Sequence, residues 1–229
     1  MKTSIKNYSD QPCDNAILGE IQYSANQWDW SSLQKNRKHP SNHSIPPFTG
    51  EDKESPAILL ILESPHTSEF KSNGVPIRPA NGTSGRNLIQ NLCNILNNYG
   101  TSTSKFSYTS IELNNFLFRN KSKTITIWIL NSIQKQCSLG ICPINNIIKE
   151  SNWLNEWLDA GNNFVSELDK ITLVCKREFF IINLCTKGEY VPLKTMVEDR
   201  LIDYLNGQGN HCSGPHPSSW GRIKKVDFK

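Results

Sequence analysis

The stretch "AILLILESPH", residues 57–66, decides the fold. Its first part, 57–62, is an unbroken apolar run. The run is too short for a core helix and is typical of a strand buried on both faces of a sheet. Polar groups follow at once, and in a parallel sheet the ligand site lies outside the carboxyl ends of the strands. The stretch therefore predicts a central strand that delivers four residues to a site: Glu63, Ser64, Pro65 and His66.

Further apolar runs alternate with segments of helical spacing. Strands are expected at 57–62, 123–130 ("KTITIWIL"), 178–184 ("EFFIINL") and, shorter, near 208–213. Helices are expected over 84–99, from Pro143 onward, before 178, and over 192–205. The apolar face of the helical region after Pro143 is expected to comprise Ile144, Ile147, Ile148, Leu154 and Leu158. The separate helix before 178 is expected to use Phe164, Leu168, Ile171 and Cys175. This alternation predicts an α/β fold with three layers, α/β/α, around a mostly parallel four-stranded sheet.

The first 55 residues differ in composition from the rest of the chain. They are rich in Asn, Ser, Gln and Pro, with Trp28 and Trp30 as the main apolar anchors. We expect residues 1–55 to be an irregular segment packed on the core and residues 56–229 to be a single domain. No apolar run approaches the roughly 20 residues that span a bilayer, and no secretory signal is visible, so a cytoplasmic protein without a membrane partner is predicted.

The seven cysteines give no framework of disulfide or metal spacing. No C-x-x-C pair occurs, and the only close pair is Cys137 and Cys142, whose role as ligands is left open. We expect reduced thiols and no metal or other cofactor.

Positive charge collects near the C-terminus of a chain whose net charge is +4. Arg222, Lys224, Lys225 and Lys229 lie close together there. A solvated basic tail explains them without a partner, and a polyanionic partner is also compatible with them.

Each candidate site residue has a structural alternative. Glu63 either caps backbone N–H groups or acts as a base, and an Asn at a strand end, such as Asn131, often simply closes an Asx-turn. His216 lies between two prolines, which hold it in one orientation. The segment "NGTSGRN", residues 81–87, resembles a phosphate cradle at a helix start. A G-x-S-x-G nucleophile elbow and a P-loop are both missing from the sequence.

Taken together and in order, four short motifs resemble the uracil-DNA glycosylase superfamily. Its members carry a strand ending in a motif of the type GQDPYH or GEAPG, a glycine-containing loop that opens a helix, a strand ending in a base-reading Asn, and a C-terminal His-Pro-Ser loop. The counterparts here are "LESPH" (62–66), "GTSGRNL" (82–88), "WILNSIQ" (128–134) and "HPSSWGR" (216–222). The resemblance covers about 57–222.

The resemblance implies a DNA glycosylase that flips a base out of the duplex and hydrolyses its glycosidic bond. His216 would donate a hydrogen bond to the departing base, Asn131 would read its edge, and Glu63 would orient water or stabilise the cationic sugar. Ser64, Pro65 and His66 would line the base pocket beside Asn131. The implied DNA contacts are Ser84, Gly85, Arg86, Ser218, Trp220 and Arg222, with Trp220 wedged into the base stack.

Two departures from the superfamily patterns bear on the substrate. The acid of the GQDPYH type stands at the third place, which is Ser64 here, and only the GEAPG type has an acid where Glu63 falls. His66 replaces the aromatic residue that blocks bulky groups at the pyrimidine 5-position. The pattern looks closest to bacterial antiviral glycosylases that excise glucosylated hydroxymethylcytosine from phage DNA.

Three alternatives stay open. Uracil or another deaminated base is the second substrate expectation, and a non-catalytic DNA-binding module with the same fold is the second class of function. An obvious lysine nucleophile is missing beside the motifs, so a monofunctional enzyme is expected, although Lys135 leaves a lyase step open. We expect a monomer whose partner is double-stranded DNA.

Overall fold

The structure is a computed structural model and describes residues 16–33, 55–64, 69, 80–133, 137, 146–175 and 178–229. Its centre is a six-stranded sheet in the order β2-β1-β5-β3-β6-β7. The strands are β1 (Ala16–Ser24), β2 (Gln27–Leu33), β3 (Ala57–Leu62), β5 (Thr124–Asn131), β6 (Phe179–Asn183) and β7 (His211–Ser213). The last four run parallel to one another, which confirms an α/β fold with a mostly parallel sheet.

The four-strand expectation is wrong, because residues 16–33 add two antiparallel strands to the sheet. These residues form a hairpin closed by Ala25 and Asn26, both with positive φ (49° and 65°), as a type I′ turn requires. Trp28 is buried and its main chain is held by Asn97, whose Oδ1 accepts from Trp28 N at 2.6 Å. This part of the N-terminal segment is therefore regular structure and not irregular.

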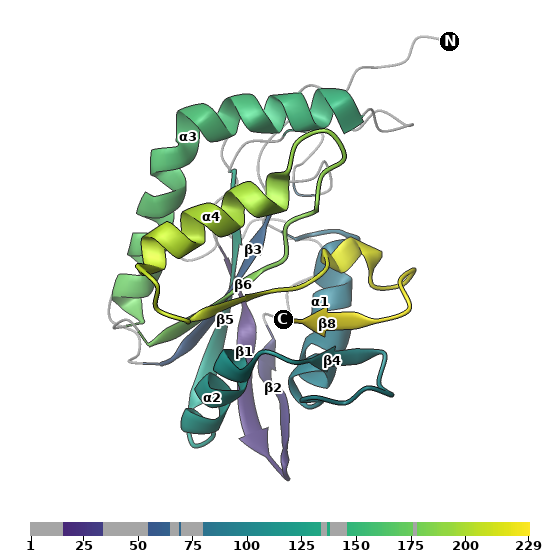
Figure 1. Cartoon of the computed structure of the whole chain (residues 1–229). Coiled ribbons are helices and arrows are strands. Elements are labelled where there is room, and N and C mark those ends of the chain that lie inside the picture. Colours follow the sequence, from purple (N-terminus) through teal and green to yellow (C-terminus); the bar gives the residue numbers. More distant parts are fainter. Residues whose placement is uncertain are drawn as a thin grey trace, which may run out of the picture.

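Two apolar cores lie on the two faces of the sheet, as side-chain alternation in β3 requires. Figure 1 shows the helices that surround the sheet. Ile58, Leu60 and Leu62 face α1 (Thr83–Leu96) and α2 (Ile111–Arg119). Ala57, Leu59 and Ile61 face α3 (Asn146–Val174) and α4 (Leu193–Leu205). The described chain thus has a helical layer on each side of the sheet.

Helix α3 differs from the expectation in length and in its buried face. It is one helix of 29 residues where two were expected, and Figure 1 shows that it bends along its course. Ile147, Ile148 and Leu158 are exposed, and Ile144 lies outside the described residues. The first half of the helix buries Trp153 and Trp157 instead, whereas Phe164, Leu168, Ile171 and Cys175 of the second half are buried as expected. The large rings of Trp153 and Trp157 bury more apolar area than Ile147, Ile148 and Leu158 would, so they take the inward face of the helix.

A small second sheet completes the C-terminal region. It pairs β4 (Phe106–Tyr108) with β8 (Val226–Phe228) in parallel. The 3₁₀ turn η2 (Pro217–Ser219) lies between β7 and β8 and follows His216 directly. None of the helices in the described ranges combines the length and apolar character needed to cross a membrane.

Candidate functional site

The carboxyl ends of the four parallel strands meet at one edge of the sheet. Asn131 at the end of β5 is level with Leu62, and Ser132 N donates to Leu62 O at 2.7 Å. Asn183 at the end of β6 is level with Ile61 on one side and with Ser213 of β7 on the other. The edge therefore carries Glu63 next to Asn131, and the chain after β7 brings His216 toward it.

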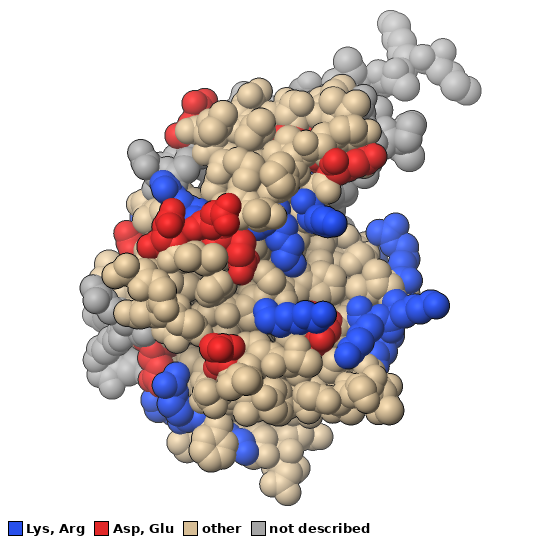
Figure 2. Space-filling view, viewed as in Figure 1, with Lys and Arg blue, Asp and Glu red and all other residues tan. Residues whose placement is uncertain are grey.

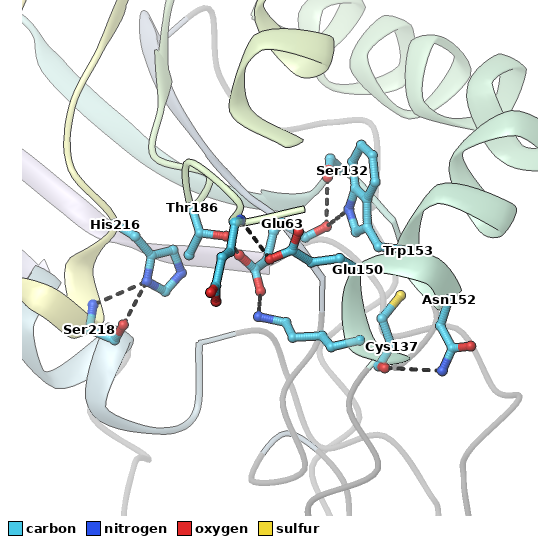
Figure 3. Close-up of polar contacts among 11 residues, drawn as sticks. Glu63, Ser132, Cys137, Glu150, Asn152, Trp153, Thr186, His216 and Ser218 are labelled. Atoms are coloured by element: carbon cyan, nitrogen blue, oxygen red, sulfur yellow. Dashed lines mark hydrogen bonds and ion pairs between the residues drawn. The ribbon is translucent and has the colours of Figure 1, made fainter. Parts of the chain in front are cut away.

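Glu63 is buried, and its carboxylate has two side-chain partners among the described residues. The residue is 5 % exposed. Lys149 of α3 forms an ion pair with Oε1, and the hydroxyl of Thr186, after β6, donates to Oε2. Figure 3 shows Thr186 and Trp153 around Glu63, with the ring of His216 turned toward Thr186. Lys149 and Thr186 were not predicted, because each lies far from Glu63 in the sequence.

The main-chain carbonyl of Glu63 is fixed separately from its side chain. It accepts from Ser132 Oγ at 2.6 Å, from Trp153 Nε1 at 3.0 Å and from Ile133 N at 3.1 Å. Three donors, from α3 and from the residues that follow β5, thus hold the peptide that follows β3.

Lys149 and its neighbour Glu150 both contact residues at this edge of the sheet. Burial lowers the pKa of Lys149, and the nearby Glu150 and Cys185 oppose that change. Glu150 accepts three main-chain N–H groups, from Glu189 at 2.8 Å and from Tyr190 and Val191 at 2.7 Å. Burial alone would raise the pKa of Glu150, but these N–H groups lower it below its ordinary value. Glu150 thereby ties the segment that carries Thr186 to α3.

Asn131 is buried at the end of β5, the strand next to β3. Its side chain lies on the opposite face of the sheet from that of Glu63. It is level with Leu62, whose side chain belongs to the core under α1. Its Nδ2 lies 3.5 Å from Oε2 of Glu69, which is also buried. The described contact of the Asn131 amide is thus with a buried carboxylate at the same edge of the sheet.

His216 is oriented by the turn that follows it. Its Nδ1 lies 2.8 Å from Ser218 Oγ and accepts from Ser218 N at 3.3 Å, as an N-cap of η2. In the neutral ring this places the proton on Nε2, which makes Nε2 the donor. Asn87 of α1 donates to Pro217 O at 2.6 Å and so joins this loop to the first turns of α1.

The predicted base-pocket residues after Glu63 are only partly described. Ser64 is half-buried at the end of β3. Pro65 and His66 lie outside the described residues.

The predicted phosphate contacts gather near the His216 loop. Ser84, Gly85 and Arg86 stand in the first turn of α1, whose N-cap Gly82 makes no side-chain cap bond. Gly85 is buried, Ser84 is half-buried and Arg86 is exposed. Ser218 is half-buried in η2, and Arg222 is exposed just beyond it. Figure 2 shows Lys and Arg side chains gathered on the right, over the loop between η2 and β8, and acidic side chains mainly over α4.

The expected wedge residue, Trp220, is a core residue instead. Its side chain is 1 % exposed, and its rings lie 6.4 Å from Phe106 and 6.1 Å from Phe228 between centroids. Its Nε1 donates to Pro215 O at 2.8 Å. Trp220 therefore anchors the His216 loop to the core, and its ring cannot stack on a base without leaving that core. The assignment to the base stack is wrong for this side chain.

A second polar cluster, which sequence reasoning missed, surrounds Glu198 of α4. Its carboxylate accepts from Asn183 Nδ2 and Ser213 Oγ, each at 2.7 Å, and lies 3.0 Å from His211 Nε2. Burial alone would raise the pKa of Glu198, but these hydrogen bonds lower it to about 2. The cluster joins α4 to β6 and β7, and it explains why Asn183 is buried without facing the site. On the same helix, Lys194 donates to Gly214 O, and burial lowers its pKa.

Metal and disulfide chemistry find no support in the described ranges. No group of three or more His, Cys, Asp or Glu side chains there is arranged to hold a metal ion. No disulfide joins any two of the five described cysteines, and Cys142 lies outside the described residues. Comparison of the chain with protein-family models, with curated proteins and with solved structures finds no match in any of the three.

Proposed function

We propose that the protein is a DNA glycosylase that flips a modified base out of the duplex and hydrolyses its glycosidic bond. The observation that carries the proposal is that Glu63 directly follows β3 and Asn131 ends the neighbouring parallel strand β5, while the oriented ring of His216 lies near Thr186, a partner of Glu63 (Figure 3). The uracil-DNA glycosylase-like motifs of the sequence supply these same three residues in the same order. Arg86 and Arg222, both exposed near that edge, suit contacts with the phosphate backbone.

The contacts of Glu63 favour one of its two expected roles. Because Lys149 neutralises its charge, Glu63 is a weak stabiliser of a cationic sugar. An ionised carboxylate has about four lone-pair positions, so two partners leave acceptor capacity for a water molecule. We therefore assign Glu63 the role of orienting the attacking water and His216 Nε2 that of donating to the departing base.

The substrate that we propose is glucosylated hydroxymethylcytosine in phage DNA, which implies a role in antiviral defence. It rests on His66, which in this sequence replaces the aromatic block against large groups at the pyrimidine 5-position. Uracil is the alternative base, and an abasic-site assay on both DNAs separates the two. Release from glucosylated phage DNA supports the first, and cleavage of uracil-containing DNA alone overturns it.

One observation favours a second candidate, a non-catalytic DNA-binding module. Both carboxylate oxygens of Glu63 already have partners, as they would in a purely structural ion pair. The two candidates predict different outcomes for Glu63→Gln and His216→Ala. For an enzyme, each substitution lowers base release by about 10²–10³-fold or more while DNA binding persists. A binding module releases no base even as the wild type.

A further inference from the structure

Lys149 is a buried cation whose position at the site nothing in the sequence motifs explains. It lies in the first turn of α3, and its side chain is 23 % exposed against 6 % for Glu63. An ammonium group is costly to bury unless an opposite charge lies against it. The same holds for the carboxylate, so each charge of the pair stabilises the other.

Two adjacent residues of α3 hold Glu63 from two directions. Lys149 contacts Oε1 directly, while Glu150 binds the main chain of residues 189–191. That segment follows Thr186, whose hydroxyl occupies Oε2. The carboxylate is thus fixed between a helix and a loop that the same helix anchors.

We propose that Lys149 is the positioning residue for Glu63: its ammonium keeps the carboxylate ionised and turned so that its remaining lone pairs face the reacting water. The proposal rests on the glycosylase function proposed above. It adds to that site a lysine from α3 that holds the acid of the "LESPH" motif in an ionised and oriented state.

The remaining titratable groups near the pair do not substitute for Lys149. In the described residues these include Glu150 of α3, the buried thiols of Cys137 and Cys185, and His216 beyond Thr186. Lys194 of α4 also lies near Cys185, but its ammonium donates to Gly214 O, and Glu69 lies beside Asn131. Glu150 is committed to main-chain N–H groups. Burial raises the pKa of Cys185 to about 12, so this thiol stays neutral at ordinary pH.

The test compares pH profiles of base release for wild type, Lys149→Gln, Lys149→Arg and the control Lys123→Gln. Lys123 pairs with Glu178 on the exposed opposite edge of the sheet. Without the ammonium, Glu63 takes up its proton at a higher pH, so the acid limb of kcat/KM moves up by about 1–3 pH units in Lys149→Gln. Lys149→Arg restores most of the wild-type profile, and the control leaves it unchanged. A decrease that is equal at every pH overturns the proposal.

Two further measurements keep the proposal falsifiable. Borohydride treatment of wild type with its abasic product should give no covalent adduct, and an adduct that requires Lys149 would make it a nucleophile and overturn a positioning role. The protonation of Glu63, followed by carbon-13 NMR and assigned with Glu63→Gln, should occur at higher pH in Lys149→Gln than in wild type. That titration needs no activity, so it still decides the role of Lys149 if no DNA releases a base.

Discussion

At the scale of the residue, Glu198 shows how a carboxylate becomes a structural element of the fold. Three side chains from two strands donate to it, and they lower its pKa from 4.5 to about 2. A carboxyl whose pKa falls on folding stabilises the folded state fully above its unfolded value. That contribution disappears as the pH falls from about 4.5 toward 2.

We therefore predict that Glu198→Gln lowers the free energy of unfolding by about 1–3 kcal/mol at pH 7, because its amide turns an N–H toward a donor. The difference between variant and wild type should shrink markedly at pH 3. Urea denaturation at both pH values measures it. Glu178→Gln, which removes only an exposed ion pair, should change stability by less than about 1 kcal/mol. An equal destabilisation at both pH values would contradict the assignment.

The residues of the site also show what sequence reasoning can reach. The places of Glu63 and Asn131 at strand ends and of His216 in a turn were predictable from short motifs, while their roles stay predictions. Lys149 and Thr186 were not, since an ion pair between distant elements leaves no local pattern. Trp220 was placed by its spacing from His216, and spacing does not tell whether a ring turns outward or into a core.

At the scale of the element, the side chain of Glu150 holds three consecutive main-chain N–H groups of the segment between β6 and α4. Glu150 accepts the N–H groups of Glu189, Tyr190 and Val191, three consecutive donors outside regular structure. Since the pKa of Glu150 is lowered, this bond set is complete at neutral pH and weakens in acid.

We predict that Glu150→Ala speeds amide hydrogen exchange at residues 189–191 by about tenfold or more, because the variant has no acceptor for their N–H groups. Exchange in β3 and β5 should change much less. Exchange measured by NMR at neutral pH checks both statements. Asp159→Ala, at an exposed position of the same helix, is the matched control and should leave these amides unchanged. Unaltered protection at all three would show that Glu150 does not hold the segment.

The helices and strands differ in how well they can be predicted from the sequence. The strands β3 and β6 were predictable from apolar runs, and β5 from its β-branched and aromatic residues. The hairpin of β1 and β2 was not, because its strands mix apolar and polar residues and its turn uses Ala25 and Asn26 where glycine is the usual signal. In α3, counting aliphatic residues selected the wrong face, since Trp153 and Trp157 decide which side is buried.

At the scale of the whole molecule, positive charge lies on one side of the site. Arg222 and Lys224 are exposed in the loop between η2 and β8, while Lys225 lies 3.9 Å from Asp227 (Figure 2). Lys105 is exposed beside β8, to which its carbonyl is hydrogen-bonded. A duplex whose flipped base reaches Glu63 would have its backbone near this loop under the proposed function.

We predict that Arg222→Gln with Lys224→Gln weakens DNA binding and reduces the slope of log K against log salt by about 2, because each removed cation leaves one phosphate without its neutralising partner. Fluorescence anisotropy across a salt series measures the slope. Lys123→Gln removes a charge from the opposite edge of the sheet and should leave the slope within error of wild type. A double variant with the wild-type slope would place the DNA elsewhere.

The three bonds to the carbonyl of Glu63 have a consequence for how such a site can change over evolutionary time. The main chain at this position is secured by Ser132, Ile133 and Trp153, none of which touches the carboxylate through these bonds. These three bonds therefore hold the main chain at position 63 independently of the side chain that it carries. Selection, or a protein engineer, that exchanges the carboxylate must also replace its partner Lys149, but the main chain that presents the side chain stays fixed.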